Sequence, residues 1–414
     1  MQLQAWKLDA EACDLPAKIG IDVTQPWTSK TARRLDAVAL LDLSRQYAAI
    51  REEILAAVER VCASGQFILG EEAAALEHEF SVYTGAAGSV GCASGTEALW
   101  LALAAAGVRP GSSVITTAFS FFASASAIVR AGARPLFVDV DPRTLNLDPA
   151  QVEAQLRAGK PNNLRALLPV HLYGQCADMD ALNRLSDAFH VPLIEDAAQA
   201  VGAAWRGRRA GSLGLAAAFS FYPTKNLSAM GDAGLVTTNS PELAERMRSL
   251  RNHGSRRRYL HQDMGWNSRL DAIQAAILRV KLPHLEDWNR CRRERAANYD
   301  RLFTQAGLLS PGDDAPVRIL SVAPHAHHVF HQYVIRARRR DALRGFLNER
   351  KIGAEIYYPI PLHLQPVFAW LGYREGDLPE SERAAREVLA LPIFPELTDE
   401  EQQWVVESVA EFYS

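Results

Sequence analysis

Lys225 is the residue whose sequence surroundings most suggest covalent chemistry. It follows the short apolar run 219–221 and Pro223, and it precedes the glycine-rich turn 231–234. A lysine placed there is held at the mouth of a parallel sheet, where its amine can form a Schiff base with a carbonyl compound. Taken alone, the same pattern also fits an ordinary solvated loop lysine, because short motifs match by chance.

A second stretch with chemical character is Ser94-Gly95-Thr96, which lies between a short apolar strand and the alanine- and leucine-rich segment 100–106. This order brings backbone N–H groups and the positive end of a helix dipole to one point, which favours an anion. Phosphate is the natural occupant. The alternative is that Ser94 or Thr96 only caps the helix.

The segments around these residues alternate between strand-like and helix-like patterns. In chain order they are 113–117, 123–131, 135–140, 166–170, about 179–189, and 191–194. This alternation predicts an α/β fold whose central sheet is mostly parallel and buried on both faces. Ligands of such sheets collect at the carboxyl ends of the strands.

Several polar and aromatic residues come directly after the predicted strands, so we expect them to meet at one edge of the sheet. They are Phe119, His171, Glu195, Asp196, Gln199, Ser220 and Lys225. An amine, a carboxylate, a phosphate loop and an aromatic side chain at one edge describe a pyridoxal 5'-phosphate (PLP) site, because that cofactor needs each of them. Asp196 is the predicted acid that keeps the pyridine nitrogen protonated.

Length and composition set the broad class. A chain of 414 residues is long enough for two packed domains. We predict an irregular extension at 1–37, a large PLP-binding domain at 38–254 and a smaller C-terminal domain at 255–414. The net charge of -3 gives no field that attracts nucleic acid, and no run is long and apolar enough for a membrane helix. The five scattered cysteines fit a reducing cytoplasm.

The order and spacing of the motifs resemble the DegT/DnrJ/EryC1/StrS family of PLP-dependent sugar aminotransferases, over about residues 38–410. The matching stretches are Ser-Gly-Thr-Glu-Ala-Leu at 94–99, Val-Asp-Val-Asp-Pro at 138–142, His-Leu-Tyr-Gly-Gln at 171–175, Glu-Asp-Ala-Ala-Gln-Ala at 195–200, Ser-Phe-Tyr-Pro-Thr-Lys-Asn-Leu at 220–227 and Gly-Trp-Asn-Ser-Arg-Leu-Asp at 265–271. The resemblance implies the aspartate aminotransferase-like fold (fold type I), with a smaller C-terminal α+β domain.

The resemblance also implies roles for individual residues. Lys225 is expected to hold the cofactor, and Asp196 to pair with its pyridine nitrogen. Further cofactor contacts are expected from Ser94, Gly95, Thr96, Phe119, Gln199, Ser220 and Asn267. Phe119 would stack on the ring, and Asn267 would reach the phosphate of the neighbouring subunit, which implies a homodimer with shared active sites. Arg269, Tyr358 and His363 are expected near the substrate.

The activity implied by the resemblance is amino transfer from an amino acid, expected to be L-glutamate, to a keto sugar, with PLP and its pyridoxamine form alternating. Lys225 argues against the dehydratase branch, which has histidine there. The segment around Tyr358 and His363 favours a nucleotide-linked 3-keto sugar over a 4-keto sugar, unless prolines 359 and 361 only stiffen a connector. An inosose aminotransferase and a non-catalytic regulatory protein remain alternatives.

Four histidines, at positions 325, 327, 328 and 331, form a cluster in the sequence. An alternating strand would place adjacent histidines on opposite faces, and no cysteine or carboxylate set accompanies them. We therefore expect no metal site there, but ordinary histidines on a strand or loop surface.

Overall fold

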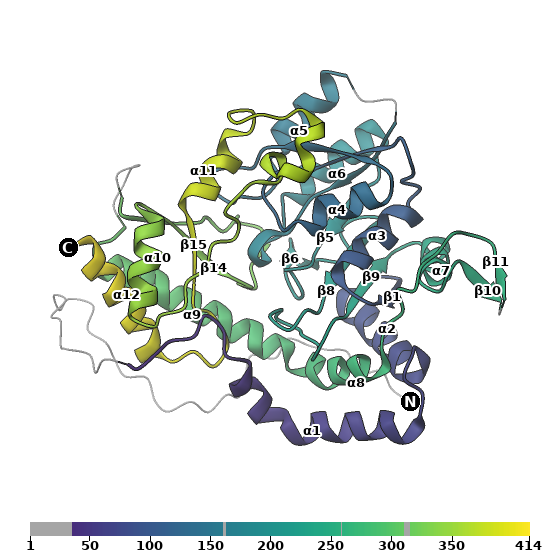
Figure 1. Cartoon of the computed structure of the whole chain (residues 1–414), viewed down its shortest axis with the longest axis horizontal. Coiled ribbons are helices and arrows are strands. Elements are labelled where there is room, and N and C mark those ends of the chain that lie inside the picture. The colour runs from purple at the N-terminus through teal and green to yellow at the C-terminus, as the bar shows by residue number, and fades with distance from the viewer. Residues whose placement is uncertain (1–34, 160–162, 258, 310–314) are drawn as a thin grey trace.

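The structure, a computed structural model, describes residues 35–159, 163–257, 259–309 and 315–414. The predicted N-terminal extension lies almost wholly outside these residues. Figure 1 shows the described chain as an α/β body on one side and a group of later helices and strands, including α10 and α12, on the other.

The central sheet consists of two parts joined edge to edge. One has the strand order β3-β2-β4, and the other has the order β5-β8-β9-β1. Parallel bridges from Leu167 to Leu193 and from Val170 to Asp196 connect β4 to β5. The strand bounds are β1 (Gly88–Cys92), β2 (Ser113–Thr117), β3 (Arg134–Val138), β4 (Leu164–Leu168), β5 (Ile194–Asp196), β8 (Ala216–Ser220) and β9 (Gly234–Thr238). Only β9 pairs in the antiparallel sense, with β1 and β8, so the prediction of a mostly parallel sheet is confirmed.

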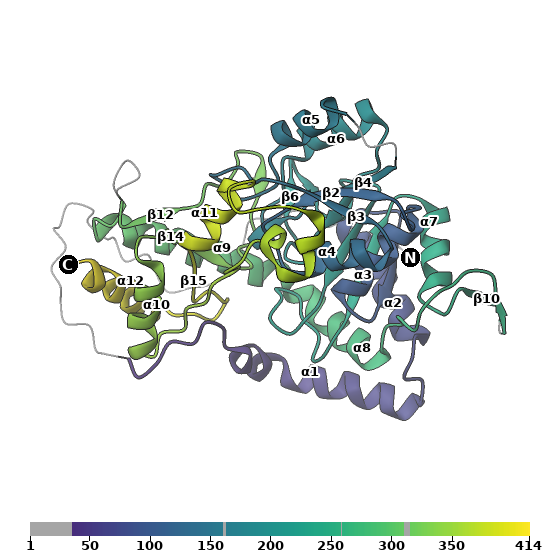
Figure 2. The same cartoon turned by 45° about the horizontal axis from the view of Figure 1, so that its top comes forward.

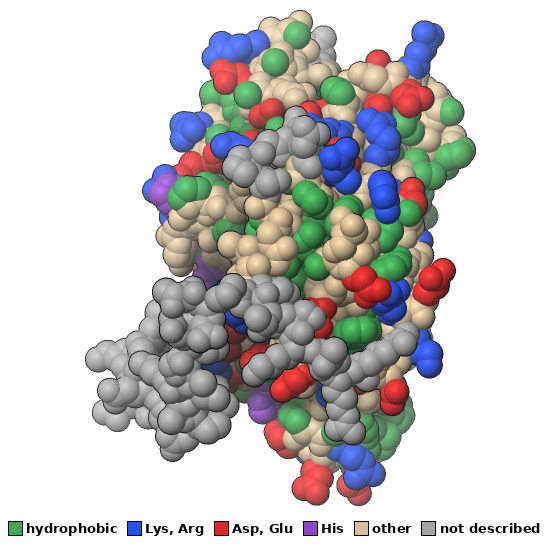
Figure 3. Space-filling view, turned by 90° about the vertical axis from the view of Figure 1, so that its left-hand side faces the viewer, with side chains coloured by type: hydrophobic (Ala, Val, Ile, Leu, Met, Phe, Trp, Pro, Cys, Tyr) green, Lys and Arg blue, Asp and Glu red, His purple; other side chains and the backbone are tan. Residues whose placement is uncertain are grey.

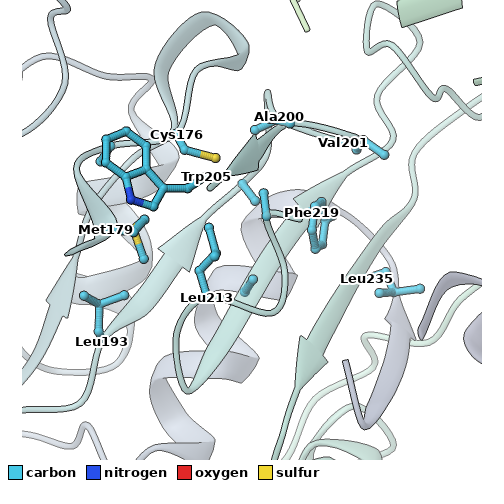
Figure 4. Packing of buried hydrophobic residues seen from close by; sticks show 14 of the residues in the cluster. Cys176, Met179, Leu193, Ala200, Val201, Trp205, Leu213, Phe219 and Leu235 are labelled. Carbon is cyan, nitrogen blue, oxygen red and sulfur yellow. The ribbon is translucent and has the colours of Figure 1, made fainter. Parts of the chain in front are cut away.

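Helices cover both faces of this sheet. They are α2 (Gly70–Thr84), α3 (Gly95–Ala105), α4 (Ala123–Arg130), α5 (Pro149–Arg157), α6 (Met179–Phe189) and α7 (Pro241–Leu250). Figure 4 shows part of the core beneath them, where Phe219 of β8, Leu235 of β9 and Met179 of α6 pack in one apolar cluster. Because both faces of β8 are buried, its small and apolar residues form a continuous run rather than an alternating one.

A long helical path runs beneath the sheet (Figures 1 and 2). The helix α1 (Leu43–Ser64) lies alongside α8 (Ala272–Lys281), which continues through the short helix η2 (Leu282–His284) into α9 (Leu285–Gln305). The helix α8 begins at Ala272, because the Asp271 carboxylate accepts the N–H groups of Ile273 and Gln274 and so caps it.

The C-terminal part has its own three-stranded antiparallel sheet, in the order β12-β14-β15, with three helices packed around it. The bounds are β12 (Val317–Ile319), β14 (Tyr333–Ala337), α10 (Arg340–Glu349), α11 (Pro379–Glu387), β15 (Val388–Leu391) and α12 (Asp399–Tyr413). Val38 pairs with Ile352 and packs in the apolar core of this part. The predicted domain limits at residues 37 and 254 stay predictions.

The remaining elements are short. They are the helices η1 (Leu172–Gly174), η3 (Leu362–Leu364) and η4 (Pro366–Leu371), and the strands β6 (Ala204–Trp205), β7 (Arg208–Arg209), β10 (Ser255–Arg257), β11 (Leu260–His261) and β13 (Ala326–His327). The β10–β11 hairpin projects from the body (Figure 2). Figure 3 shows positive and negative side chains interspersed on the coloured part of one face. Within the described residues, no helix is long and apolar enough to cross a membrane.

Candidate active site

Lys225 lies in the loop that connects β8 to β9. The loop folds back on itself, because the N–H of Lys225 donates to the Tyr222 carbonyl and the N–H of Ala229 donates to that of Phe221, both at 2.8 Å. The Lys225 side chain is half-buried. Burial lowers the pKa of its amine to about 8, against the opposing effect of the Asp196 charge. A larger neutral fraction at neutral pH makes this amine a better nucleophile than that of a surface lysine.

Asp196 is the last residue of β5, and its carboxylate is buried. The Ser124 hydroxyl donates to Oδ2 at 2.7 Å, and the Ala198 N–H donates to Oδ1 at 3.2 Å. Burial raises the pKa of this carboxyl, while the Ser124 bond and the Lys225 charge oppose the shift. The two partners fix the orientation of the carboxylate, and its effect on the pKa of Lys225 shows that the two groups are close.

The start of α3 approaches the end of β8 without room for side-chain atoms. Ser94 caps α3 by accepting the Glu97 N–H at 3.2 Å. A Cβ atom on Gly95 would lie 2.5 Å from the Ser220 Cβ, and one on Gly234 would overlap the Ser94 carbonyl. Only glycine fits at either place. The result is a turn of bare backbone at a helix N-terminus, with the Ser220 hydroxyl beside it, which suits a phosphate group.

The structure bears on the prediction for the stacking aromatic residue. The Phe119 ring has no exposed surface, because it packs in an apolar cluster with Leu172 and Tyr173. It therefore offers no face to a cofactor ring. Phe121 is 56% exposed. Its carbonyl accepts the N–H of Ser124, the residue that orients Asp196. A ring can stack only on an accessible face, and Phe121 offers one, while the stacking role expected of Phe119 stays a prediction.

Gln199 holds Tyr358 in the same region. Its Oε1 accepts the Tyr173 N–H at 2.6 Å, which fixes the amide orientation, and its Nε2 donates to the Tyr358 hydroxyl at 2.9 Å. The Tyr358 ring lies 6.1 Å, between centroids, from the rings of both Phe119 and Phe121. Burial and the charge of Asp196 raise the pKa of Tyr358. Four of the predicted residues, namely Asp196, Gln199, Lys225 and Tyr358, are thus brought together.

Glu195 and His171, which also come directly after predicted strands, form a buried structural pair. Glu195 accepts the N–H groups of Gly211, Leu213 and Gly214 at 2.8 to 3.0 Å. The His171 Nε2 lies 3.0 Å from the same carboxylate, and the Ala177 N–H donates to His171 Nδ1. These bonds fasten the loop before β8 to β5, so the pair positions the sheet edge.

The segment 267–269 lies beside the start of α3. The Ala93 N–H donates to the Ser268 carbonyl at 3.2 Å, and Arg269 pairs with Cys92. The Arg269 Nη1 donates to the Asn252 side chain at 3.3 Å, and its Nε is buried without a partner among the described residues. Asn267 pairs with Asn252 through the backbone and is exposed. This places Arg269 near the Ser94 turn.

His363 is the predicted substrate contact with the least access. Its side chain is buried, and its Nε2 lies 3.1 Å from the Glu382 carboxylate. The neighbouring Leu362 N–H donates to the Ala118 carbonyl at 2.7 Å, which holds this segment against the end of β2. A contact between His363 and substrate therefore requires its surroundings to open.

The expectation of surface histidines is wrong for two of the four. His328 and His331 are buried, and burial lowers the pKa of His328 to about 3. The His331 Nδ1 lies 3.2 Å from the side-chain oxygen of Asn226, the residue after Lys225. Sequence patterns do not reveal this contact, because the two residues are 105 positions apart in the chain. Among the described residues, no group of three potential metal ligands converges.

A family model gives the same assignment as the motifs. The model described as the DegT/DnrJ/EryC1/StrS aminotransferase family matches residues 48–410. The chain belongs to this family. The family is one of PLP-dependent aminotransferases of fold type I.

Related proteins of this family cover nearly the whole chain. A "pleiotropic regulatory protein" of Geobacillus stearothermophilus is 52% identical over 380 residues, which are 91% of this chain and 98% of the relative. A Streptomyces venezuelae protein named dTDP-3-amino-3,4,6-trideoxy-alpha-D-glucose transaminase is 46% identical, covering 91% and 96%. The crystal structure of S. venezuelae DesV superposes with a TM-score of 0.86 at 44% identity, covering 91% and 99%.

The residues present fit the family's cofactor. The turn at Gly95 leaves space that a Cβ would fill, Asp196 supplies a buried carboxylate, and Lys225 supplies an amine near it. Phe121 and Ser124 were missed by the sequence reasoning, because neither directly follows a strand. The sequence 119–124 does contain them, two and five residues after Phe119, so the turn into α4 was the available signal.

Proposed function

We propose that this chain moves an amino group from L-glutamate to the keto group at carbon 3 of a nucleotide-linked hexose, in amino-sugar biosynthesis. The observation that carries the proposal is the Lys225 amine, with its lowered pKa, close to the buried Asp196 carboxylate. The S. venezuelae relative named as a dTDP-3-amino sugar transaminase supports the nucleotide and carbon 3. A 4-keto sugar is less favoured.

The proposed cofactor residues form two groups, one that binds the phosphate and one that binds the pyridine ring. Ser94, Gly95, Thr96 and Ser220 bind the phosphate through backbone N–H groups and hydroxyls. Asp196 pairs with the ring nitrogen, and Phe121, rather than Phe119, offers a ring face. Gln199 lies beside the ring through its contact with Tyr358. PLP held in this way supplies an electron sink for negative charge at the donor's α-carbon.

Lys225 has two proposed tasks. Its amine holds the cofactor at rest. Once released, the same amine takes the proton from the α-carbon of the donor, and it returns a proton to the sugar carbon in the second stage. A pKa of about 8 suits both directions of this transfer, because the amine is then neither permanently protonated nor too weak a base at neutral pH.

The proposed substrate contacts are Tyr358, Arg269 and His363. Tyr358 lies beside Gln199, and the Arg269 Nε, near the phosphate turn, has no partner among the residues that the structure describes. His363 joins the set only if the segment around η3 moves, because it is buried against Glu382.

A homodimer with shared active sites is the proposed assembly. Asn267 is exposed and follows the projecting β10–β11 hairpin, where Leu260 on β11 is 49% exposed and Met264, just after β11, is 85% exposed. Exposed apolar side chains of this size mark protein interfaces. In this proposal Asn267 reaches the phosphate of the neighbouring subunit. The cytoplasm is the proposed compartment, since the cysteines in the described residues are free.

A substrate panel tests the function. The protein is supplied with PLP, L-glutamate and keto sugars with and without a nucleotide, and products are identified by mass spectrometry. We expect amination of a nucleotide-linked 3-keto hexose. Amination of free inosose alone would contradict the proposal in favour of a cyclitol enzyme. The regulatory name of the 52% identical relative keeps a non-catalytic regulator as a second candidate. Cofactor absorbance that persists after L-glutamate is added would favour it.

A further inference from the structure

A small pocket lies beside the Lys225 loop, since Thr224 lines it. It has a volume of about 70 Å³ and is lined by Leu40, Leu41, Thr224, Arg292, His331, Gln332, Tyr357, Ala390, Leu391 and Ile393. A buried water needs roughly 10–15 Å³ of such a cavity, so the pocket can hold several waters or a small polar group. Thr224 precedes Lys225 directly. His331 is close enough to Lys225 for the lysine charge to lower its pKa. The pocket therefore adjoins the candidate active site.

Arg292, on α9, is the charged residue of this pocket. Its side chain is 3% exposed. Its Nη1 donates to the carbonyls of Ile393, Phe330 and His331 at 3.0 to 3.4 Å, while its Nε is buried without a partner among the described residues. Burial lowers the pKa of this guanidinium to about 10, against the opposing charge of Glu396. It remains a cation at neutral pH.

The other buried arginines of the described chain all have a carboxylate partner. Arg251 pairs with Glu77, Arg336 with Glu387 and Arg340 with Asp341. Arg292 forms no ion pair with a described residue, and no acidic side chain lines its pocket. A buried cation without a counter-ion is costly, and the cost falls when an anion binds. The arrangement thus favours an anionic ligand.

The uncharged groups around Arg292 suit a carboxylate. The Gln332 Oε1 is buried and has no partner within the described part of the chain, and turning this amide presents its N–H groups instead. The amide of Asn226 is fixed, because its Nδ2 donates to the Val329 carbonyl. Its oxygen therefore accepts from His331 Nδ1. Burial lowers the pKa of this histidine, so it adds no competing charge at neutral pH.

We propose that Arg292 binds the side-chain carboxylate of the amino-acid donor while the donor's amine reacts beside Lys225. This inference rests on the proposed function. The pocket is lined by Thr224 and His331, and neither Lys225 nor Asp196 lines it. It therefore takes the part of the donor farther from the reacting α-carbon. A dicarboxylic donor gains from this site, and a donor that ends in a methyl group does not.

The test compares two donors of similar shape on the holoenzyme. L-Glutamate ends in a carboxylate and L-norvaline in a methyl group, and loss of the cofactor's visible absorbance reports the first half of the reaction. For Arg292→Met we expect the preference for L-glutamate to fall about tenfold or more, as for a lost charge-assisted hydrogen bond. Conversion of the keto sugar by the pyridoxamine form should be unchanged. An unchanged donor ratio would overturn the proposal.

Controls separate this effect from loss of structure. Arg340→Met removes another buried arginine, one that donates to the carbonyls of Ala385 and Val388 outside the pocket. It should lower the melting temperature without changing the donor ratio. If Arg292→Met does not fold, Arg292→Lys carries the test, with a smaller fall expected because the charge stays.

Glutarate binding tests the proposed carboxylate site at Arg292 independently of amino transfer. Glutarate, followed by calorimetry, should bind the wild-type holoenzyme more tightly than valerate, and Arg292→Met should remove the difference. If this difference is present but no amino donor reacts, the proposed function fails and the carboxylate site stands. If donors react but glutarate binds no better than valerate, the carboxylate site is wrong and the aminotransferase proposal stands.

Discussion

The Ser124 hydroxyl on α4 donates a 2.7 Å hydrogen bond to the Asp196 carboxylate at the end of β5, and both side chains are buried. Ser120 extends the chain, since its hydroxyl lies 2.9 Å from that of Ser124. The carboxylate proposed to face the cofactor's ring nitrogen is thus oriented by α4, a helix that packs on β2 and β3.

Replacing Ser124 tests this orientation. Ser124→Ala removes a bond that lowers the pKa of Asp196, so less of the carboxyl is ionised and its pairing with a protonated ring nitrogen weakens. We expect about fivefold weaker cofactor binding, which corresponds to a typical net hydrogen bond. Titration of the apoprotein with PLP measures it. Ser126→Ala, on the same helix, is the control, because its hydroxyl reaches only the Ala123 carbonyl. Equal affinities for both variants would contradict the role of Ser124.

Cofactor capture by the apoprotein should depend on pH through Lys225. Only the neutral amine forms the covalent bond, and its pKa is about 8. The capture rate should therefore rise about fivefold from pH 7 to 8 and at most about twofold above that. The Asp196 charge raises the pKa of Lys225, so Asp196→Asn should move the midpoint to lower pH. Stopped-flow absorbance gives the profile, and a midpoint near 10 would show an unperturbed lysine.

The close approach of Gly95 to Ser220 predicts that a second substitution can restore cofactor binding lost in Gly95→Ala. In Gly95→Ala the new Cβ would lie 2.5 Å from the Ser220 Cβ, so the start of α3 must shift and the phosphate turn with it. We expect at least tenfold weaker cofactor binding, measured by equilibrium titration. Ser220→Gly in the same chain removes the clash and should restore part of the affinity. Gly345→Ala has open space around it and should leave binding unchanged. The absence of rescue would show that the clash is not the cause.

Substitutions of Phe119 and Phe121 should have different effects. Phe121→Leu removes an exposed ring and should weaken cofactor binding and shift the absorbance maximum, with little change in melting temperature. Phe119→Leu removes a fully buried ring and should destabilise the fold by about 1–3 kcal/mol instead. Thermal melts of the apoprotein and cofactor titration separate the two effects. Weaker cofactor binding in Phe119→Leu alone would restore the original stacking assignment.

The sequence predicted those parts of the site that depend on strand ends. Strand–helix alternation placed Asp196, Ser220 and Lys225 at one edge of the sheet, and the structure brings the ends of β5 and β8 together as expected. The turn that contains Gly95 was recognisable because a Ser-Gly-Thr turn directly before a helix is typical of an anion site. These features depend on local pattern and on one general rule about parallel sheets.

Other parts depend on contacts between segments that lie far apart in the chain. Arg292 and His331 come from α9 and from the loop before β14, and only the packing of those elements brings them to Thr224. Phe119 and Phe121 are both aromatic residues after a strand, and which ring is exposed is decided by Leu172 and Tyr173, about 50 residues later. Spacing alone carries no information about such neighbours.

The most direct test of the central claim is to locate the cofactor on the chain. The holoenzyme is reduced with sodium borohydride, digested and mapped by mass spectrometry. We predict that the cofactor is found on the peptide containing Lys225, and that Lys225→Ala carries none and transfers no amino group. Labelling of another lysine instead, such as the buried Lys281, or normal transfer by Lys225→Ala, would contradict the account.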